Sequence, residues 1–570
     1  MTDDVRIPIV LGVTGHRDPH PEAVEQLEAE VRSIFDELRG QYPNTPLVLL
    51  SPLAEGADRL AARVAVDAGV QLFVPLPWPE DACPELIHRS GDREEFHSLL
   101  AQATQTMPLP LVDGATGHEL KEQQDCREKH WAQVGAYIAR HSQILIALWD
   151  GNDRSSSSTA QTIRWQREGQ PAPFARNLGL LDEVERGPVF HIKTPRTGTT
   201  APFTVERNVL YPPSNHKNQQ GQESEHFGAM WESLDLFNSD ISVGTPAFAD
   251  RLKKSRDWLL PKDRQEQLPS PLKPLFESFA RADAAAMIYQ DHSHRTLKWL
   301  FAVVACAGVS LEVYAHLAVD WWQLLALYIG LLFAAGLMHR SSQKQRYQGR
   351  HLDYRALAEA LRVQFFWMVA ELPDSVADHY LRHFRSELDW IRQAVRACVL
   401  VSGGHHLATT GAQLDVVDRF EWISTHWMED QRKYFEATAS QKYARDLLFE
   451  TWGKWAFRLA VGFAIASLGT HLVTGHMSHP LIVAVFLMAL IAAMLTEWSE
   501  KSGYVVDTHR YQWMAALFAT AGQHLKALGK GSDSTTALEL IKELGTEALS
   551  ENAEWVIQHR HRPVSPPAAG

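Results

Sequence analysis

Two pairs of long apolar stretches constrain this chain more than any other feature of its sequence. They cover residues 297–317 and 321–338, then 455–473 and 480–498. Each stretch has about 18–21 residues, enough for a helix to cross a hydrocarbon core of about 30 Å. The mean hydropathy of −0.23 hides these stretches, because it averages them with a more polar remainder. We therefore expect four membrane-spanning helices; the alternative is two buried helical hairpins in a large soluble domain.

Tryptophan side chains mark the ends of these stretches. They are Trp299, Trp321, Trp322, Trp455 and Trp498. Tryptophan is enriched where a membrane helix meets the interface between lipid and water. The pattern therefore favours spanning helices over buried hairpins.

The positions of Lys and Arg predict how the spans are oriented. The turns within each pair contain neither residue, whereas Arg340 and Lys344 follow the second stretch. Lys454 precedes the third stretch and Lys501 follows the fourth. Because short cytoplasmic loops carry the excess of positive charge, we expect a multi-pass protein of the cell inner membrane with both termini in the cytoplasm.

The two pairs of stretches have similar surroundings. Tyr289 and Arg295 precede the first pair, and Tyr443 and Arg445 precede the second. Segments 351–361 and 508–518 follow them, each with apolar residues at helical spacing. The shared order predicts a duplicated unit of helix, span, turn, span and helix, with the outer helices forming a stalk. Packing between these helices explains their apolar residues better than a ligand site does.

The first 200 residues predict a different fold. We expect strands at 7–13, 47–50, 70–74 and 144–149, a last strand at 189–192, and helices at 21–38 and 59–68. The apolar runs are typical of buried parallel strands, and their alternation with helices predicts a Rossmann-like α/β domain with a doubly wound parallel sheet.

Charge and cysteine usage exclude several classes of protein. The net charge of −13 argues against a general nucleic-acid-coating protein, which would be basic. The cysteines Cys83, Cys126, Cys306 and Cys398 are far apart, and none has zinc-site spacing. We therefore expect no nucleic-acid partner and no bound metal.

Four turns of the α/β domain follow predicted strands, where ligands bind in such sheets. Small residues, helix starts and an Arg in these turns suit a phosphate. The candidate ligand-binding residues are Gly12, Thr14, Gly15, His16, Arg17, Glu55, Gly56, Ala57, Asp58, Trp149, Asp150, Gly151, Ser157, Ser158, Thr159 and Arg196.

Each turn also has a purely structural explanation. Gly15 fits a plain turn, Asp58 fits a helix N-cap, and the serines at 155–158 fit a flexible loop. His16 fits either a ligand donor or a structural hydrogen bond. Four such turns in one domain favour a nucleotide-like ligand.

The motifs in these turns resemble the SLOG superfamily, the Rossmann-like group that contains the LOG and DprA proteins and the sensor domain of TRPM channels. The resemblance is carried by Gly12–Arg17, Leu53–Arg59, Leu148–Gly151 and Ser158–Ala160, within about Arg6–Arg196. It implies a domain that binds a nucleotide-derived or ADP-ribose-like signal, as in anti-phage systems that join such domains to membrane effectors. The repeated helix–span–span–helix unit similarly resembles SLATT effector modules.

The sequence departs from the enzymatic members of that superfamily. LOG phosphoribohydrolases carry a PGGxGTxxE loop, but here residues 155–162 have serines for the glycines and Thr162 for the Glu. We therefore expect a ligand-gated membrane effector without that catalytic residue. Glu55 and Asp58 leave a membrane-tethered nucleotide or N-glycosyl hydrolase as an alternative. A nucleotide-independent scaffold is the second alternative.

These interpretations divide the chain into segments. The α/β domain covers 1–200, a loop-rich connector 201–275, the duplicated units 276–371 and 441–530, a cytoplasmic helical segment 372–440, and a C-terminal helix with a disordered tail 531–570. Four spans rarely enclose a conduit alone, so we expect a homo-oligomer in the bilayer. Glu312 is the acid inside the first span and the pore-lining candidate; its alternative is an acid near the far interface.

Overall fold

The computed structural model describes residues 5–79, 93–152, 157–171, 174, 185–199, 204–213, 220–380, 388–403, 416–528 and 534–560. It divides into two compact units. An α/β unit holds residues 1–244, 269–278 and 374–411, and a helical unit holds 245–268, 279–373 and 412–570. The segment expected at 372–440 is therefore shared between the units. The tail expected after residue 560 lies outside the described residues.

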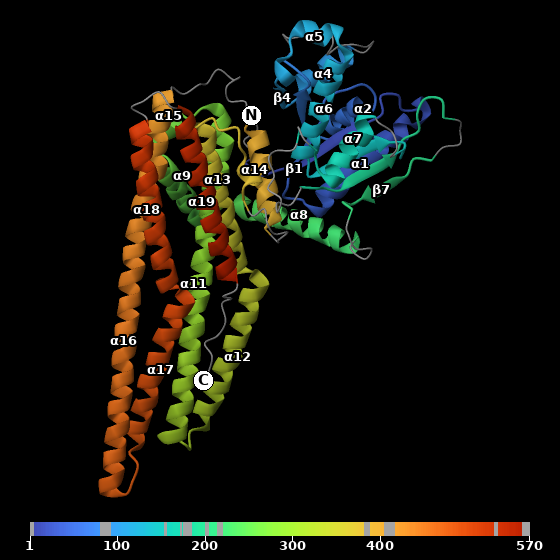
Figure 1. The fold of residues 1–570 in the computed structure, drawn as a ribbon. Helices are drawn as coiled ribbons and strands as arrows, with labels where there is room; N and C mark the ends of the chain where they lie inside the picture. The colour runs from blue at the N-terminus through green and yellow to red at the C-terminus, as the bar shows by residue number, and fades with distance from the viewer. Residues whose placement is uncertain are drawn as a thin grey trace. The chain divides into compact units, whose positions relative to one another are not determined.

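The α/β unit is built on one sheet with the strand order β4-β3-β2-β1-β5-β6-β7 (Figure 1). Its strands are β1 (Ile9–Gly15), β2 (Leu47–Leu50), β3 (Gln71–Leu76), β4 (Gln105–Pro108), β5 (Ile144–Trp149), β6 (Val189–Lys193) and β7 (Arg207–Leu210). Pairs from β4 to β6 are parallel, and β7 pairs antiparallel with β6. The α/β fold with a mostly parallel sheet is thus confirmed, but β6 is not the last strand.

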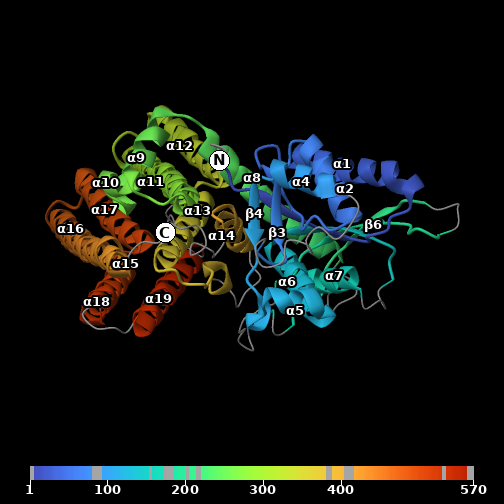
Figure 2. The same ribbon diagram turned by 90° about the horizontal axis from the view of Figure 1, so that it is seen from above.

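Helices cover both faces of this sheet (Figure 2). One face carries α1 (Val24–Gln41), α2 (Ala57–Asp67) and α4 (Arg93–Gln102), and the other carries α5 (Gly117–Glu122), α6 (Gln124–His141) and α7 (Ser158–Glu168). The central strands β2 and β5 are buried along their whole length. A parallel sheet covered on both sides buries its strands completely, which is why each reads as an uninterrupted apolar run.

The segment expected to be a loop-rich connector is largely helical. It contains α8 (Gln220–Ser242), α9 (Pro246–Leu259) and α10 (Lys262–Glu266). The fully buried Asn238 of α8 holds the start of β1, because its amide accepts from Ile7 N at 2.9 Å and donates to Ile7 O at 2.8 Å. This helix therefore closes the edge of the sheet where the parallel strands begin. Near the chain's middle, α14 (Asp389–Val401) also belongs to the α/β unit.

The helical unit contains two sets of helices with matching lengths. The first set is α11 (Lys273–His316, 44 residues), α12 (Trp322–Gln345, 24) and α13 (Tyr347–Val369, 23). The second set is α16 (Asp430–Thr474, 45), α17 (His479–Ser502, 24) and α18 (Tyr504–Leu528, 25). In each set, one residue with a left-handed backbone conformation separates the second helix from the third. It is Arg346 (φ 51°) before α13 and Gly503 (φ 65°) before α18. Both halves thus have the order that the sequence predicts for a duplicated unit. The unit is completed by α15 (Val416–Ile423), a short π-helix (Ser424–Glu429) and α19 (Ser534–Arg560).

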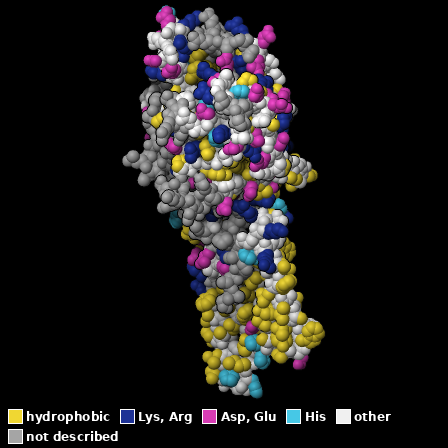
Figure 3. All heavy atoms as spheres, turned by 90° about the vertical axis from the view of Figure 1, so that its right-hand side faces the viewer, with side chains coloured by type: hydrophobic (Ala, Val, Ile, Leu, Met, Phe, Trp, Pro, Cys, Tyr) yellow, Lys and Arg dark blue, Asp and Glu magenta, His cyan; other side chains and the backbone are white. Residues whose placement is uncertain are grey.

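Four helices in this unit are long and apolar enough to cross a membrane. They contain the four predicted spans, and only 6–28% of their most apolar windows is buried within the chain. Large apolar side chains such as Phe333, Phe457 and Ile465 are exposed, and Figure 3 shows hydrophobic side chains gathered over this region with few charges among them. Such a surface is costly in water and requires lipid or further protein around it.

The first and fourth spans pack against each other. Phe301 of α11 meets Trp498 of α17 with ring centroids 5.4 Å apart. Further along, Gly308 lies against Phe486 and Leu490, where a Cβ would be in ordinary contact at 3.5 Å. Ser310 Oγ also donates to the Leu324 carbonyl at 2.8 Å, which joins α11 to α12.

Candidate functional site: a cavity at the carboxyl edge of the sheet

A cavity of about 390 Å³ opens beyond the carboxyl ends of β1, β2 and β3. Each strand contributes to the wall at its carboxyl end: Arg17 follows β1, residues 52–55 follow β2, and residues 76–78 include the last residue of β3 and the two after it. Helices α2, α4 and α6 supply the rest, including Arg59, Phe96 and Trp131. Its place fits the rule that ligands of open α/β sheets bind outside the carboxyl ends of the strands.

Arginines and aromatic rings dominate the chemistry of this cavity. The guanidinium of Arg17 lies 5.7 Å from the ring centre of Trp131, and that of Arg59 lies 5.7 Å from the ring centre of Phe96. Trp131 also packs edge-on against the buried Trp78, with centroids 6.4 Å apart. Cations over aromatic faces are partly fixed in place before any ligand arrives.

The charge balance of the wall favours an anion. Its arginines are Arg17, Arg59 and Arg127, and its acids are Glu55 and Glu128. Arg59 Nη1 lies 3.7 Å from Glu95, and Arg127 donates to backbone carbonyls. Arg17 is exposed and forms no salt bridge with any carboxylate in the described part of the chain. A planar guanidinium of this kind suits bidentate binding of a phosphate.

The loop between β2 and α2 is strained where it lines the cavity. Leu53 is almost fully buried, yet its φ of 54° lies in the left-handed region that non-glycine residues rarely adopt. Arg59 Nε donates to the Leu53 carbonyl at 3.1 Å, and Leu53 N donates to Ser51 Oγ at 3.3 Å. Local strain costs on the order of 1–3 kcal/mol and persists where neighbours enforce it, typically at functional sites.

Gly56 allows this loop to meet the loop after β1. Its φ is 78°, and a Cβ there would approach the His16 carbonyl to 2.6 Å. The neighbouring Ala57 N donates to that same carbonyl at 3.0 Å. At Gly15, a Cβ would likewise come within 2.7 Å of the Leu148 carbonyl. Both glycines therefore serve close backbone packing that sets the shape of the cavity edge.

Asp58 lies buried beneath this edge and does not line the cavity. Burial raises the pKa of its carboxyl from 3.8 to about 8, although Arg17 and Arg59 act in the opposite direction. Its Oδ1 atom has no hydrogen-bond partner among the residues that the structure describes. Asp58 is therefore protonated at neutral pH. It does not neutralise the positive charges of Arg17 and Arg59, which remain available to an incoming anion. It is not the N-cap of α2, because that helix begins at Ala57, its N-cap is Gly56, and no side chain caps it.

The remaining predicted residues brace the loop after β1 from its other side. His16 Nε2 accepts from Asp150 N at 3.0 Å, so this histidine forms a structural hydrogen bond. Thr159 Oγ1 donates to the Gly15 carbonyl at 2.9 Å. Further out, Arg196 Nε is 3.0 Å from Asp18 Oδ1. These contacts fix the position of Arg17 without adding to the cavity wall.

Several candidates have roles in packing or capping. Gly12 and Thr14 lie within β1, and a Cβ on Gly12 would come within 2.7 Å of Ile138 of α6. Trp149 is buried against His191, with centroids 5.3 Å apart, and Gly151 turns the chain after it with φ 88°.

Ser157 caps α7 by accepting from Ala160 N at 3.3 Å, and Ser158 is the first residue of that helix. The buried Thr162 donates to the Ser158 carbonyl at 3.0 Å. The preceding residues 153–156 of the predicted serine loop lie outside the described residues.

Sequence reasoning missed the aromatic and basic part of the wall. Trp78 is the second residue after β3, so the rule used for the other strand ends would also have selected it. Phe96, Arg127 and Trp131 come from helices on opposite faces of the sheet, and only the fold brings them together.

One further prediction, Glu312, lies in the first span. Glu312 lies one turn before the end of α11, and its Oε1 is 3.3 Å from His316 Nε2, near the end of the span rather than at its centre. Within the described ranges, no group of His, Cys, Asp and Glu residues is arranged to hold a metal ion.

The fold and the cavity define a class: a Rossmann-like α/β unit joined to a helical unit with four helices capable of crossing a membrane. The chain matches no protein-family model, no curated protein and no solved structure. Its function must therefore be argued from the cavity and the helices themselves.

Proposed function

We propose that this protein is a membrane effector whose α/β unit binds a nucleotide-derived signal and whose four spans respond to it. The cavity at the carboxyl ends of β1 to β3 carries this proposal, because it combines an unpaired Arg17 with aromatic surfaces at the edge of the sheet on which ligands of open α/β sheets bind. Phosphate groups would bind the arginines, and a base would stack on an aromatic ring such as Trp131.

The response is opening of a pore or disruption of the bilayer by a homo-oligomer. The extensive apolar surface of the spans leaves room for contacts with further copies. The positive charges beside the spans favour an inner-membrane protein with cytoplasmic termini. The SLOG and SLATT resemblances suggest an ADP-ribose-like signal and a role in anti-phage defence.

A path for coupling exists within the chain. α11 starts in the α/β unit, which contains residues 269–278, and continues as the first span of the helical unit. A ligand shifts such an equilibrium only if it binds one state more tightly than the other. Closure of the cavity around the ligand would supply that difference in affinity.

The test is thermal unfolding of the full-length protein in detergent with nucleotides, cyclic nucleotides and ADP-ribose derivatives. We expect one class to raise the melting temperature, because a ligand at 100 times its Kd stabilises the folded state by about 2.7 kcal/mol. Arg17→Ala removes a charge-assisted hydrogen bond worth about 1.5–3 kcal/mol, so binding should weaken roughly 10- to 100-fold.

Arg32→Ala is the matched control, because Arg32 lies on the exposed face of α1, 4.0 Å from Asp67. Stabilisation by no compound would support the scaffold alternative. Turnover of the bound compound that depends on Glu55 would support the hydrolase.

A further inference from the structure

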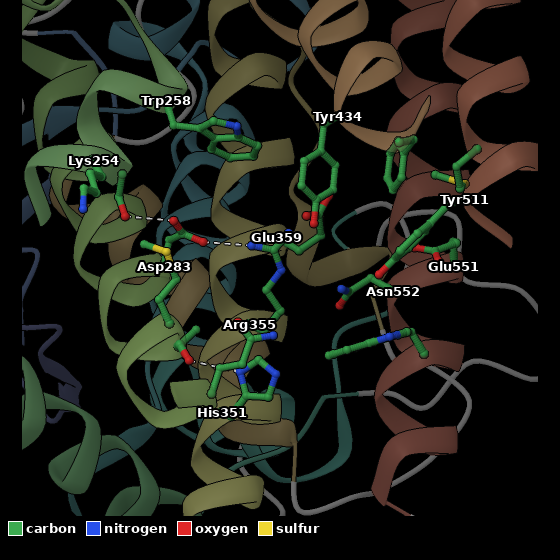
Figure 4. Close-up of a pocket in the computed structure, with 17 residues that line it drawn as sticks. Lys254, Trp258, Asp283, His351, Arg355, Glu359, Tyr434, Tyr511, Glu551 and Asn552 are labelled. Atoms are coloured by element: carbon green, nitrogen blue, oxygen red, sulfur yellow. Dashed lines mark hydrogen bonds and ion pairs between the residues drawn. The ribbon is translucent and has the colours of Figure 1, made fainter. Parts of the chain in front are cut away.

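A second cavity lies inside the helical unit, among the helices that extend the spans. Its volume is about 340 Å³, and its wall is formed by α9, α11, α13, α16, α18 and α19 (Figure 4). This volume is at the lower end of the range for small-molecule sites. The sequence indicates only helix packing here, since the lining residues lie far apart along the chain.

The charged groups of this wall are matched in pairs. Arg355 donates to Asp283 at 2.8 Å, and Ser255 Oγ donates to the other oxygen of Asp283 at 2.8 Å. Glu359 pairs with Arg362 of the same helix.

On the other side of the cavity Glu551 pairs with Arg510, and at its rim Lys254 pairs with Asp250 at 2.7 Å. His351 is neutral, because burial lowers its pKa to about 3, and its Nδ1 donates to the Ala286 carbonyl. A wall with balanced charges gives no net attraction to a phosphate.

The wall also disfavours an organic cation. The guanidinium of Arg362 already lies 5.3 Å from the ring centre of Trp258, and Arg355 sits between the helices at the cavity. A cationic ligand would have to approach these fixed positive charges. The site therefore suits an uncharged molecule.

Aromatic rings and unused polar groups face the space that remains. Figure 4 shows the hydroxyl ends of Tyr434 and Tyr511 turned toward the middle of the cavity, near Arg355 and Asn552. Neither hydroxyl forms a hydrogen bond with another described residue. The indole Nε1 of Trp555, which also lines the cavity, is buried and has no hydrogen-bond partner among the described residues. Buried polar groups normally have partners, so this N–H, together with the two hydroxyls that open into the cavity, points to a bound molecule that accepts and donates hydrogen bonds there.

We propose that this cavity binds an uncharged purine base or nucleoside. A flat heterocycle would stack on one of the aromatic rings that line the cavity, and base stacking on aromatic side chains is worth about 1–3 kcal/mol per base. The edge of a purine carries both donors and acceptors, which match the tyrosine hydroxyls. The proposal does not depend on the phosphate-binding cavity of the α/β unit, whose ligand differs in charge.

The position of this site gives it a direct connection to the spans. α11 and α16 continue through the first and third spans, while α13 and α18 follow the second and fourth spans after the breaks at Arg346 and Gly503. A ligand held among these four helices sets their spacing next to the membrane. The site would thus regulate the spans independently of the α/β unit.

The experiment is equilibrium binding of radiolabelled adenosine to the full-length protein in detergent, with guanosine and AMP as competitors. We expect saturable binding, competition by at least one nucleoside or base, and at least tenfold weaker competition by AMP. Met287→Trp places a large ring in the cavity and should weaken binding more than tenfold, whereas Met287→Leu, the matched control, should preserve it.

Tyr511→Phe removes one hydroxyl and should weaken binding roughly three- to tenfold without disturbing the fold. Arg17→Ala should leave adenosine binding unchanged, which separates this site from the one in the α/β unit. The proposal is overturned if natively folded protein binds neither adenosine nor guanosine, or if Met287→Trp leaves binding intact. Equal affinity for AMP would also overturn it.

Discussion

Replacing the buried Asp58 by asparagine should make the α/β unit more stable. In the folded protein the pKa of Asp58 is raised by burial from 3.8 to about 8. Between these values the folded state holds a proton that the unfolded state has lost, so stability falls as the pH rises from about 4 to 8 and is constant above. Each pKa unit corresponds to about 1.36 kcal/mol. At pH 7, about three units above the unfolded pKa, the carboxyl costs about 4 kcal/mol relative to a neutral side chain.

Hydrogen exchange of the β1 and β2 amides in the full-length protein measures this effect locally. We expect Asp58→Asn to raise the free energy of opening by about 4 kcal/mol at pH 7 and by about 1.5 kcal/mol at pH 5. Asp67→Asn on the same helix is the control, because Asp67 is 70% exposed and should change little. A destabilised Asn variant, or a difference independent of pH, would show that folding does not raise the pKa of Asp58. That result would refute the charge balance assigned to the cavity.

Three further perturbations test other parts of the structure. Gly56→Ala should destabilise the α/β unit by more than 2 kcal/mol, whereas Gly69→Ala should cost about 1 kcal/mol. Both glycines have a positive φ, but only at Gly56 would a Cβ clash with backbone atoms. Equal melting temperatures of the two variants would contradict the close contact between the loops after β1 and β2. Lys442→Met should destabilise the helical unit by about 3–5 kcal/mol, because it leaves the buried Asp507 unpaired. Adding Asp507→Leu to this variant should restore much of the lost stability. Chemical denaturation of the two single variants and the double variant measures this coupling, and losses that simply add would show that the pair is absent. Gly308→Leu should lower the melting temperature in detergent, because α11 packs against α17 at Gly308. Gly330→Leu is the control and should not lower it, because the space around Gly330 is open. A lower melting temperature for Gly330→Leu than for Gly308→Leu would exclude this packing.

The sequence predicted the buried part of the sheet better than its edges. The strands at 47–50 and 144–149 match β2 and β5 residue for residue, because a strand buried on both faces is an apolar run bounded by polar turns. β4 and β7 were missed because they lie at the edges of the sheet, where only Met107 of β4 is buried and β7 is partly exposed. Edge strands lack the periodic apolar signal on which such predictions rest.

The candidate sites show a different limit. Arg17 and Glu55 were found because they follow strands, and a strand end is visible in the sequence. Trp131 was not, because helical aromatic residues usually pack in a core, and only the tertiary fold turns this one toward Arg17. The sequence likewise did not indicate Arg355 as a cavity residue of the helical unit, because charged residues on a helix normally face water.

Dye release from proteoliposomes containing the full-length protein tests the central claim most directly. The nucleotide that raises the melting temperature should trigger release at concentrations near its Kd, and Arg17→Ala should shift that response to roughly 10- to 100-fold higher concentration. Release that does not depend on the nucleotide, or tight nucleotide binding that causes no release, would contradict a membrane effector controlled by the α/β unit.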